Sequence, residues 1–359
     1  MGEMISSFVI KILIIVAALA VAVCVAVGVI LGVKHSKEND TGDGGAVQTG
    51  GDVDDDGLGG SPLYKTNATR SSYIGTSDSS TKLIEGIKSN NAILVELDGY
   101  TVVASKGADE KIYPASMTKV MTLLVACEMV TDLEEVLEVK EEHINFLVQS
   151  GGSADVTFTA GDWVRVEDLL NLIIYDSDTI ACLLLAERYG GSEAGFVELM
   201  NNKAEEMGLT STNFKNTTGL HDAEHYTTCR EMAAIMAYSF ENELAKKILT
   251  AYEGYRFKTY EADGKTVRDT HLSWSDWYSN KERFYNNPVI SGSNPKVTVI
   301  AGKTGKEEIP RNCFVTYATD ANGVGYVAVT VGRSNESQPG VLAAESTADM
   351  KYIYRNYVK

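Results

Sequence analysis

A long apolar run near the start of the chain is the feature that most constrains what can fold. Residues 12–33, ILIIVAALAVAVCVAVGVILGV, contain no charged side chain. At about 1.5 Å of rise per helical residue, such a run can cross a hydrocarbon core of roughly 30 Å. The sequence therefore predicts one transmembrane anchor at residues 12–33, behind a short N-terminal segment at residues 1–11, and removes both from the folded domain.

Two other interpretations compete for the apolar run. A cleaved signal peptide usually has an apolar core of about 7–15 residues before a small-residue cleavage site, and this run is longer. Cys24 suggests a lipidation site, but a valine precedes it where a small residue is expected. Lysines flank the run on both sides, so the charge of the neighbouring segments does not set its orientation. A membrane anchor is the preferred interpretation.

A flexible acidic linker is predicted at residues 34–80. Its central part, ENDTGDGGAVQTGGDVDDDGLGGS, is rich in Gly, Asp and Thr and almost free of apolar residues. Such a composition cannot bury enough surface to offset the entropy lost on ordering. DVDDDG at residues 52–57 imitates the start of a calcium-binding EF-hand loop, but Leu63 stands where that loop needs a bidentate Glu. No calcium site is therefore expected.

Charge and cysteine content narrow the function classes. The formal net charge of −17 argues against nucleic-acid binding, which relies on a basic surface to displace counterions from phosphates. The cysteines beyond the apolar run lack CxxC spacing and lie in apolar or mixed segments, so buried thiols are favoured over disulfides. They are Cys127, Cys182, Cys229 and Cys313.

Residues 81–359 are predicted to form one α+β domain. NAILVELDGYTVVAS predicts a hairpin that turns at Asp98-Gly99. Strands at both ends predict an antiparallel sheet completed by both termini, with a largely helical region inserted. Residues 251–295 fit no clear pattern. Helical patterns occur at 116–130, 165–175, 179–190, 192–208, 230–249 and about 341–357, and strand patterns at 91–105, 296–304, 313–319 and 325–332.

One short segment places a serine one helical turn before a lysine. PASMTKVMT at residues 114–122 contains Ser116 and Lys119, and positions i and i+3 share a helix face. Pro114 suits a helix start, which puts Ser116 at the end that carries partial positive charge. A serine nucleophile needs a base, and a lysine in apolar surroundings can act as one. The spacing alone also fits a capping serine with a surface lysine.

Two further motifs favour catalysis. SMTK at 116–119, SDT at 177–179 and KTG at 303–305 follow the order that is typical of penicillin-binding proteins and class A β-lactamases. The chain resembles the low-molecular-mass penicillin-binding proteins that are serine D-alanyl-D-alanine carboxypeptidases, the S11 peptidases. The likeness runs from about residue 91 to the C-terminus and includes NTTGLHDAEHYTT at 216–228. It implies the transpeptidase fold that these enzymes share with β-lactamases.

The resemblance also implies roles for three residues of the first two motifs. Ser116 is the nucleophile and Lys119 is the base that activates it. Ser177 relays a proton between the two motif lysines and the leaving amine. These three residues are the expected catalytic group.

The third motif is implied to bind the substrate. Lys303 and Thr304 would hold the terminal carboxylate at the edge of a strand, where Gly305 lets the backbone come close. The backbone N–H groups of Ser116 and Lys306 would form the oxyanion hole. Losing one such donor costs about 2.7–4 kcal/mol in a well-studied hydrolase.

The sequence departs from the family pattern at several places. Thr179 stands where the second motif has an asparagine, and a hydroxyl is shorter than an amide and has fewer donors, so its implied contact with the substrate is in doubt. KEEIPRN follows KTG in place of small residues, and Arg333 is the nearest counterpart of a carboxylate-binding arginine. His221 and His225 have helix-like spacing, but their segment is expected to be a loop, so no metal site is predicted. Neither a C-terminal β domain nor a C-terminal anchor is expected.

The resemblance implies an enzyme that removes the terminal D-alanine from peptidoglycan stem pentapeptides through an acyl-enzyme at Ser116. Such an enzyme needs no cofactor and is inhibited covalently by β-lactams. We expect it to be held in the cytoplasmic membrane by its N-terminal helix, with its catalytic domain on the cell-wall side. The alternatives are a penicillin-binding sensor with low turnover because of Thr179, a D,D-endopeptidase, or a β-lactamase, although no deacylation glutamate is recognisable.

Overall fold

The computed structural model describes residues 74–151, 158–251, 254–273, 289–307, 311–333 and 342–359. The predicted anchor and most of the predicted linker lie outside these ranges. Within them, no helix has both the length and the hydropathy that a membrane crossing requires. The predicted linker boundary at residue 80 is too late, because residues before 81 already pack on the domain. Ile74 is buried, and the Gly75 N–H donates to the Tyr100 carbonyl at 3.0 Å.

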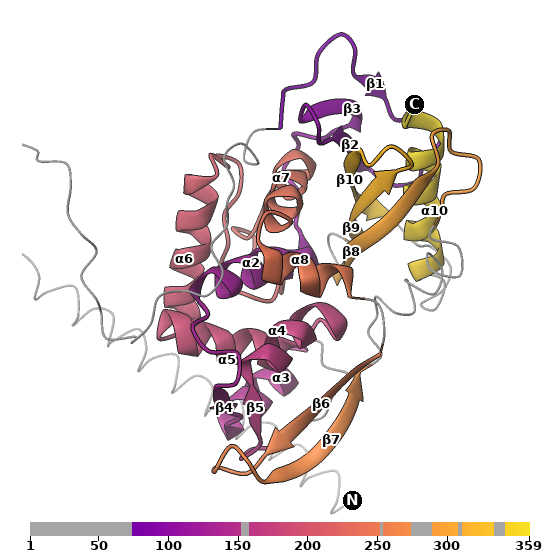
Figure 1. The fold of residues 1–359 in the computed structure, drawn as a ribbon. Helices are drawn as coiled ribbons and strands as arrows, with labels where there is room; N and C mark the ends of the chain where they lie inside the picture. The colour runs from indigo at the N-terminus through magenta and orange to yellow at the C-terminus, as the bar shows by residue number, and fades with distance from the viewer. Residues whose placement is uncertain (1–73, 152–157, 252–253, 274–288, 308–310, 334–341) are drawn as a thin grey trace, which may run out of the picture. The chain divides into compact units, whose positions relative to one another are not determined.

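A six-stranded sheet carries the third motif (Figure 1). Its strands are ordered β1-β3-β2-β10-β9-β8, and every neighbouring pair is antiparallel except β1 with β3. Because β10 pairs with β2, strands from both ends of the domain meet inside the sheet, as the sequence predicted. The strands are β1 (Lys82–Leu83), β2 (Asn91–Glu96), β3 (Thr101–Lys106), β8 (Val297–Glu307), β9 (Arg311–Asp320) and β10 (Gly325–Arg333).

Both faces of this sheet are covered by helices. Along β2, Ile93 and Val95 belong to the apolar core shared with α2 (Lys119–Met129) and α7 (Cys229–Ser239), whereas Ala92 and Leu94 belong to a second cluster with α10 (Leu342–Tyr357). This alternation follows from the period of two along a strand. Figure 1 shows α7 and α10 on opposite sides of the sheet. β2 is therefore an apolar strand buried on both faces.

The inserted helical region is built around α2 (Lys119–Met129). Its residues from Lys119 to Cys127 are all buried, because α4, α5, α6, α7 and α8 pack around it. A lysine is rarely buried unless it is paired, so the lysine that opens α2 is expected to have partners inside the domain. The other helices are η1 (Ala115–Thr118), α3 (Glu141–Ser150), α4 (Val166–Tyr175), α5 (Thr179–Gly190), α6 (Glu193–Glu206), α7 (Cys229–Ser239) and α8 (Glu243–Thr250).

A second, four-stranded antiparallel sheet packs against α4 and α5. Its order is β4-β5-β6-β7, and its last two strands lie in the stretch that fitted no pattern. Its first two strands are three residues each, too short to show a period of two. The strands are β4 (Val136–Glu138), β5 (Trp163–Arg165), β6 (Tyr255–Tyr260) and β7 (Val267–Ser273).

One predicted helix is wrong in the structure. Residues 230–249 form two helices, α7 and α8, because the chain leaves the helical path after Ser239 and restarts at Asn242. The Asn242 side chain accepts hydrogen bonds from the Leu244 and Ala245 N–H groups, which caps α8 and fixes the break. The four cysteines of the described domain are buried free thiols, as expected.

Candidate active site

The first motif lies where the chain enters α2. Ser116 belongs to the 3₁₀ turn η1, Pro114 caps that turn, and Lys119 opens α2. The predicted helix start is therefore confirmed, with the tighter 3₁₀ geometry in its first turn. Ala115 has a φ of 46°, a left-handed conformation that a non-glycine residue adopts at an energetic cost and that is frequent at functional sites.

Lys119 is buried beside the serine. Its side chain is 2% exposed, and its Nζ lies 3.3 Å from Ser116 Oγ and 2.6 Å from the carbonyl oxygen of Thr218. Ser116 itself is partly exposed, so a substrate can reach its hydroxyl. The expected side-by-side arrangement is confirmed. The amine also has a backbone acceptor that the spacing of SxxK did not indicate.

The second and third motifs form a similar pair. Ser177 lies between α4 and α5 with a φ of 54°, and Lys303 lies on β8. Lys303 Nζ donates to Ser177 Oγ at 3.0 Å and to the Thr304 carbonyl at 2.9 Å. Both side chains are buried. Residues far apart in sequence are thus brought together as the family resemblance implied.

Two glycines bring their segments close to Ser116. A side chain at Gly305 would meet the carbonyl oxygen of Pro114 at 3.0 Å and the nitrogen of Ser116 at 3.1 Å. A side chain at Gly219, where φ is +86°, would meet the carbonyl oxygen of Ala115 at 1.9 Å. Strand β8 and the loop before α7 therefore lie directly against the chain around Ser116. Only glycine allows the second approach without rearrangement.

The loop at residues 214–227 is fixed to the first motif by a histidine. His225 Nε2 lies 2.8 Å from Thr118 Oγ1, and its Nδ1 accepts from the Lys215 N–H at 3.2 Å. Because Nδ1 is an acceptor, Nε2 carries the proton and donates to Thr118. Burial lowers the pKa of His225 to about 4. Both ring nitrogens are engaged within the protein, while the second histidine considered for a metal, His221, is exposed and packs edge-on against Tyr113.

The second motif carries an acidic residue next to its serine. Asp178 is fully buried and caps α5 by accepting from the Ala181 N–H at 2.7 Å. Burial raises the pKa of Asp178 to about 7; the neighbouring Asp176 also raises it, and Lys119 lowers it. Thr179, the expected substrate contact, is 1% exposed, and its hydroxyl has no hydrogen-bond partner among the described residues.

The structure places the other predicted substrate contacts on or near β8. Thr304 is partly exposed and Lys306 is exposed, in the register Lys306↔Asn312 beside β9. Arg333 ends β10 and pairs with the same Asn312, so it lies two strands away from Lys306. Its side chain is outside the described atoms. The carboxylate-binding role of Arg333 stays a prediction.

One group of metal-capable side chains lies away from the motifs. Atoms of Glu142, His143 and Glu187 all lie within 4.8 Å of one another. Lys140 Nζ already pairs with the two glutamates at 3.3 and 3.0 Å, and the Lys140 N–H donates to His143 Nδ1. A metal at Nε2 would have to displace this lysine and reverse the tautomer of the ring. The group is therefore an ion-pair network that joins α3 to α5.

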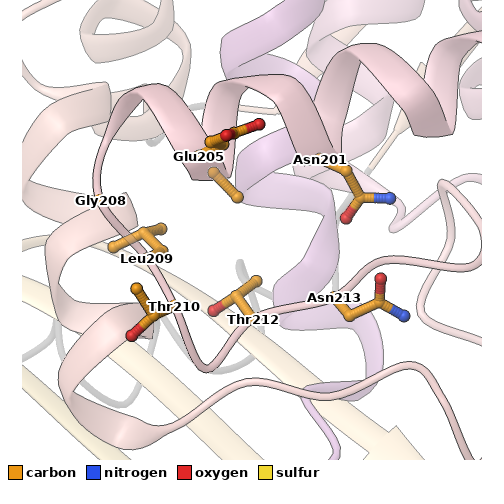
Figure 2. Close-up of a pocket in the computed structure, with 8 residues that line it drawn as sticks. Asn201, Glu205, Gly208, Leu209, Thr210, Thr212 and Asn213 are labelled. Atoms are coloured by element: carbon orange, nitrogen blue, oxygen red, sulfur yellow. The ribbon is translucent and has the colours of Figure 1, made fainter.

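A cavity of about 210 Å³ lies at the C-terminal end of α6 (Figure 2). Asn201 and Asn213 lie on one side of it, and Leu209 and Thr210 on the other. Its polar groups serve the fold: Asn201 accepts from the Phe214 N–H and donates to the Phe214 carbonyl, at 2.8 and 3.0 Å. The cavity is lined by no motif residue, and Asn201 anchors the beginning of the loop at residues 214–227.

Comparison with protein families gives a match over most of the domain. The model of the S11 peptidases, described as D-alanyl-D-alanine carboxypeptidase, matches residues 77–335. The chain is 34% identical over 168 residues to the D-alanyl-D-alanine carboxypeptidase DacF of Bacillus subtilis, covering 47% of this chain and 43% of that protein. It is 25% identical over 237 residues to a D-alanyl-D-alanine endopeptidase of Pseudomonas aeruginosa, covering 66% and 69%. The chain thus spans less than half the length of the DacF relative.

Solved structures share the fold. The Streptomyces K15 DD-transpeptidase superposes with a TM-score of 0.62 at 22% identity, covering 76% of this chain and 98% of that one. A D-alanyl-D-alanine carboxypeptidase from Mycobacterium tuberculosis gives a TM-score of 0.61 at 20% identity, covering 78% and 96%. At these identities the likeness establishes the architecture, which confirms the predicted α+β class.

Proposed function

The chain belongs to the S11 family of D-alanyl-D-alanine carboxypeptidases, and from this premise we propose that it removes the terminal D-alanine from peptidoglycan stem pentapeptides. One observation carries the proposal: a partly exposed Ser116 Oγ lies 3.3 Å from the amine of a buried lysine, Lys119. This distance is slightly longer than a normal hydrogen bond, which is common for catalytic groups without substrate. The pair suits proton abstraction from a serine nucleophile.

The proposed reaction begins with attack of Ser116 Oγ on the carbonyl carbon between the last two D-alanines. Lys119 Nζ takes the hydroxyl proton, and the negative charge that develops on the carbonyl oxygen is held by the N–H groups of Ser116 and Lys306. The amide bond then breaks, the D-alanine amine receives a proton through Ser177, and an ester remains on Ser116. Water hydrolyses this ester and regenerates the serine.

Substrate recognition is assigned to the strand side of the site. Lys303 offers a positive charge beside Ser177, and Thr304 offers a hydroxyl from the same strand. We propose that both bind the terminal carboxylate. β-Lactams would react with Ser116 in the same way and leave a slowly hydrolysed ester. The apolar run at residues 12–33 supports a further part of the proposal, that the enzyme is held in the cytoplasmic membrane with this domain on the cell-wall side.

Covalent labelling tests the proposal directly. The intact mass of the chain should increase by one penicillin after incubation with benzylpenicillin, and the S116A variant should show no increase. Release of D-alanine from a diacetyl-L-Lys-D-Ala-D-Ala peptide should depend on the same serine. Labelling that persists in S116A would refute the assignment of the nucleophile, and labelling without D-alanine release would favour the low-turnover sensor.

A D,D-endopeptidase is the second candidate. It is favoured by the similarity to the Pseudomonas aeruginosa endopeptidase, which extends over two thirds of both chains. An endopeptidase cleaves the D-alanyl bond of a cross-linked peptide, where the leaving amine belongs to a second stem. Digestion of purified cross-linked muropeptides distinguishes the two activities, because a carboxypeptidase would leave the dimers intact and shorten only pentapeptide ends.

A further inference from the structure

The carbonyl that contacts Lys119 belongs to a tight loop with an asparagine at its centre. Asn216 Oδ1 accepts from the Gly219 N–H at 2.7 Å and from both the N–H and the hydroxyl of Thr218 at 3.2 Å. Its Nδ2 donates to the Leu220 carbonyl at 2.8 Å. One side chain thus closes the turn over residues 216–220. These bonds are local, and they determine the direction in which the Thr218 carbonyl points.

That direction matters for a neutral amine. A neutral lysine has two N–H bonds and one lone pair, so an N–H fixed on the Thr218 carbonyl at 2.6 Å limits where the lone pair can point. Ser116 Oγ lies 3.3 Å from the same amine. An amine free to rotate would spend part of its time with the lone pair turned away from the hydroxyl proton. Misplacement of a catalytic group by about 1 Å can reduce a rate by about 10²-fold.

We propose that Asn216 is a positioning residue for acylation: it holds the Thr218 carbonyl against Lys119 Nζ so that the amine presents its lone pair to Ser116. The inference rests on the proposed function of Ser116 and Lys119. It adds a residue that touches neither the substrate nor the reacting atoms. The side chain acts through one backbone carbonyl.

Other contacts hold the same loop at different points. Glu193 accepts from the N–H and the hydroxyl of Thr217, at 3.1 and 3.0 Å, and His225 fixes Thr118 from the far end of the loop. Neither touches Thr218 or Gly219. These contacts keep the loop in place when Asn216 is changed, so substitution of Asn216 should leave a folded protein with a less well-fixed carbonyl.

The test compares three variants of the full chain. N216A removes all four hydrogen bonds, N216D keeps an acceptor oxygen for the three donors, and N201A is the matched control. Asn201 also makes two hydrogen bonds to the same loop, but to the backbone of Phe214. Figure 2 shows Asn201 at the edge of the cavity. The measured quantity is the second-order rate constant for acylation by fluorescent penicillin, at pH values from 5 to 10, with melting temperatures recorded in parallel.

We expect the plateau rate of N216A to fall about 10- to 100-fold, while N216D stays within about threefold of the wild type. The pH profiles should move in opposite directions. In N216A the Thr218 carbonyl is less well fixed and favours the ammonium form less, so the rising limb moves to lower pH, whereas the carboxylate of N216D moves it to higher pH. Asp178, Cys182 and His225 each interact electrostatically with Lys119, and all three remain in every variant.

The outcomes separate the two proposals. If N216A labels as fast as N201A, with the profile of the wild type, the positioning role is wrong although the proposed function stands. If N216A and N216D lose stability and rate equally, with no shift of either profile, Asn216 is only structural and the inference fails. If the wild type does not label, the proposed function fails first. Rescue by N216D together with opposite profile shifts supports the inference.

Discussion

Two serine–lysine pairs lie at the candidate active site, and they are assembled in opposite ways. Ser116 and Lys119 are three positions apart on one turn, with 3.3 Å between Oγ and Nζ. Ser177 and Lys303 are 126 positions apart, with 3.0 Å between the same atoms. Both lysines are 2% exposed. The first contact is produced by helix geometry, and the second by docking of β8 beside the turn between α4 and α5.

The comparison shows what each pair depends on. The local pair forms when η1 and α2 form, and its amine then needs the Thr218 carbonyl as a second partner. The distant pair requires the sheet, the helical region and the close contact of Gly305 with Ser116 to be correct together. A substitution that removes a polar group is therefore expected to affect the local pair most. A substitution that disturbs packing is expected to affect the distant pair most.

The largest expected effect is on the rate of acylation, and it differs between substitutions of the two lysines. Lys119→Met should reduce the rate of acylation by penicillin about 10³-fold, because general bases of this kind contribute roughly 10²–10⁴-fold. Lys303→Met should reduce it about 10- to 100-fold, because Lys303 donates to Ser177, whereas Lys119 lies beside Ser116 Oγ. Stopped-flow or gel-based labelling measures both. Equal losses would mean that the two lysines share one role and would contradict the assignment.

The next comparison concerns the two glycines that approach the nucleophile. Gly219→Ala should destabilise the domain by about 3 kcal/mol, because the new carbon would overlap the Ala115 carbonyl at a positive φ. Gly305→Ala should cost about 1 kcal/mol, because its new contacts are at 3.0–3.1 Å. Urea denaturation measures both free energies of unfolding. A Gly219→Ala loss no greater than that of Gly305→Ala would contradict the described loop.

His225 should make the loop side of the site sensitive to acid. Its folded pKa of about 4 lies below the ordinary value of 6.5, so the unfolded chain binds the proton more tightly. The stability contribution is complete above about pH 6.5 and is lost as the pH falls to about 4, a loss of about 3 kcal/mol. Denaturation curves of the wild type and H225Q should therefore converge toward pH 4. Parallel curves would show that this histidine does not titrate as described.

The smallest expected effect lies in the second motif. The hydroxyl of Thr179 is buried without a partner among the described residues, and Thr179→Val keeps its shape and removes that group. The free energy of unfolding should rise by up to about 1 kcal/mol. A decrease above 1 kcal/mol would indicate that the hydroxyl has a partner. Thr179→Asn, in the same experiment, reports whether the site has room for the usual amide.

The proximity of the local pair was accessible from sequence, because residues three positions apart share one face of a helix, but the spacing alone also fitted a capping serine with a surface lysine. The distant pair was not: nothing in the spacing of Ser177 and Lys303 indicates contact, and only resemblance to a family joined them. The hairpin at Asp98-Gly99 and the three strands near the C-terminus were also predicted correctly, since each shows a clear turn or alternation. Strands of three residues, as in β4 and β5, carry no such signal.

Two parts of the site could not be read from residue types. The acceptor for Lys119 is a main-chain carbonyl at Thr218, and every residue has one, so only the fold selects it. Asn216 was visible in the NTTGLHD segment, yet its role depends on hydrogen bonds to Thr218, Gly219 and Leu220 of the kind that a turn-forming asparagine makes in many loops. The break between α7 and α8 was missed for the same reason, because Asn242 in a helical pattern is ambiguous until its capping bonds are seen.

The position of β8 in the chain has a consequence for biosynthesis. Ser116 and Lys119 emerge from the ribosome long before Lys303, and β10, which joins β9 and β8 to β2, emerges later still. A nascent chain of this protein therefore holds Ser116 and Lys119 without the strand that completes their surroundings. The arrangement of all three motifs arises only when the last strands have been made, so the order of synthesis delays assembly of the site until the domain is nearly complete.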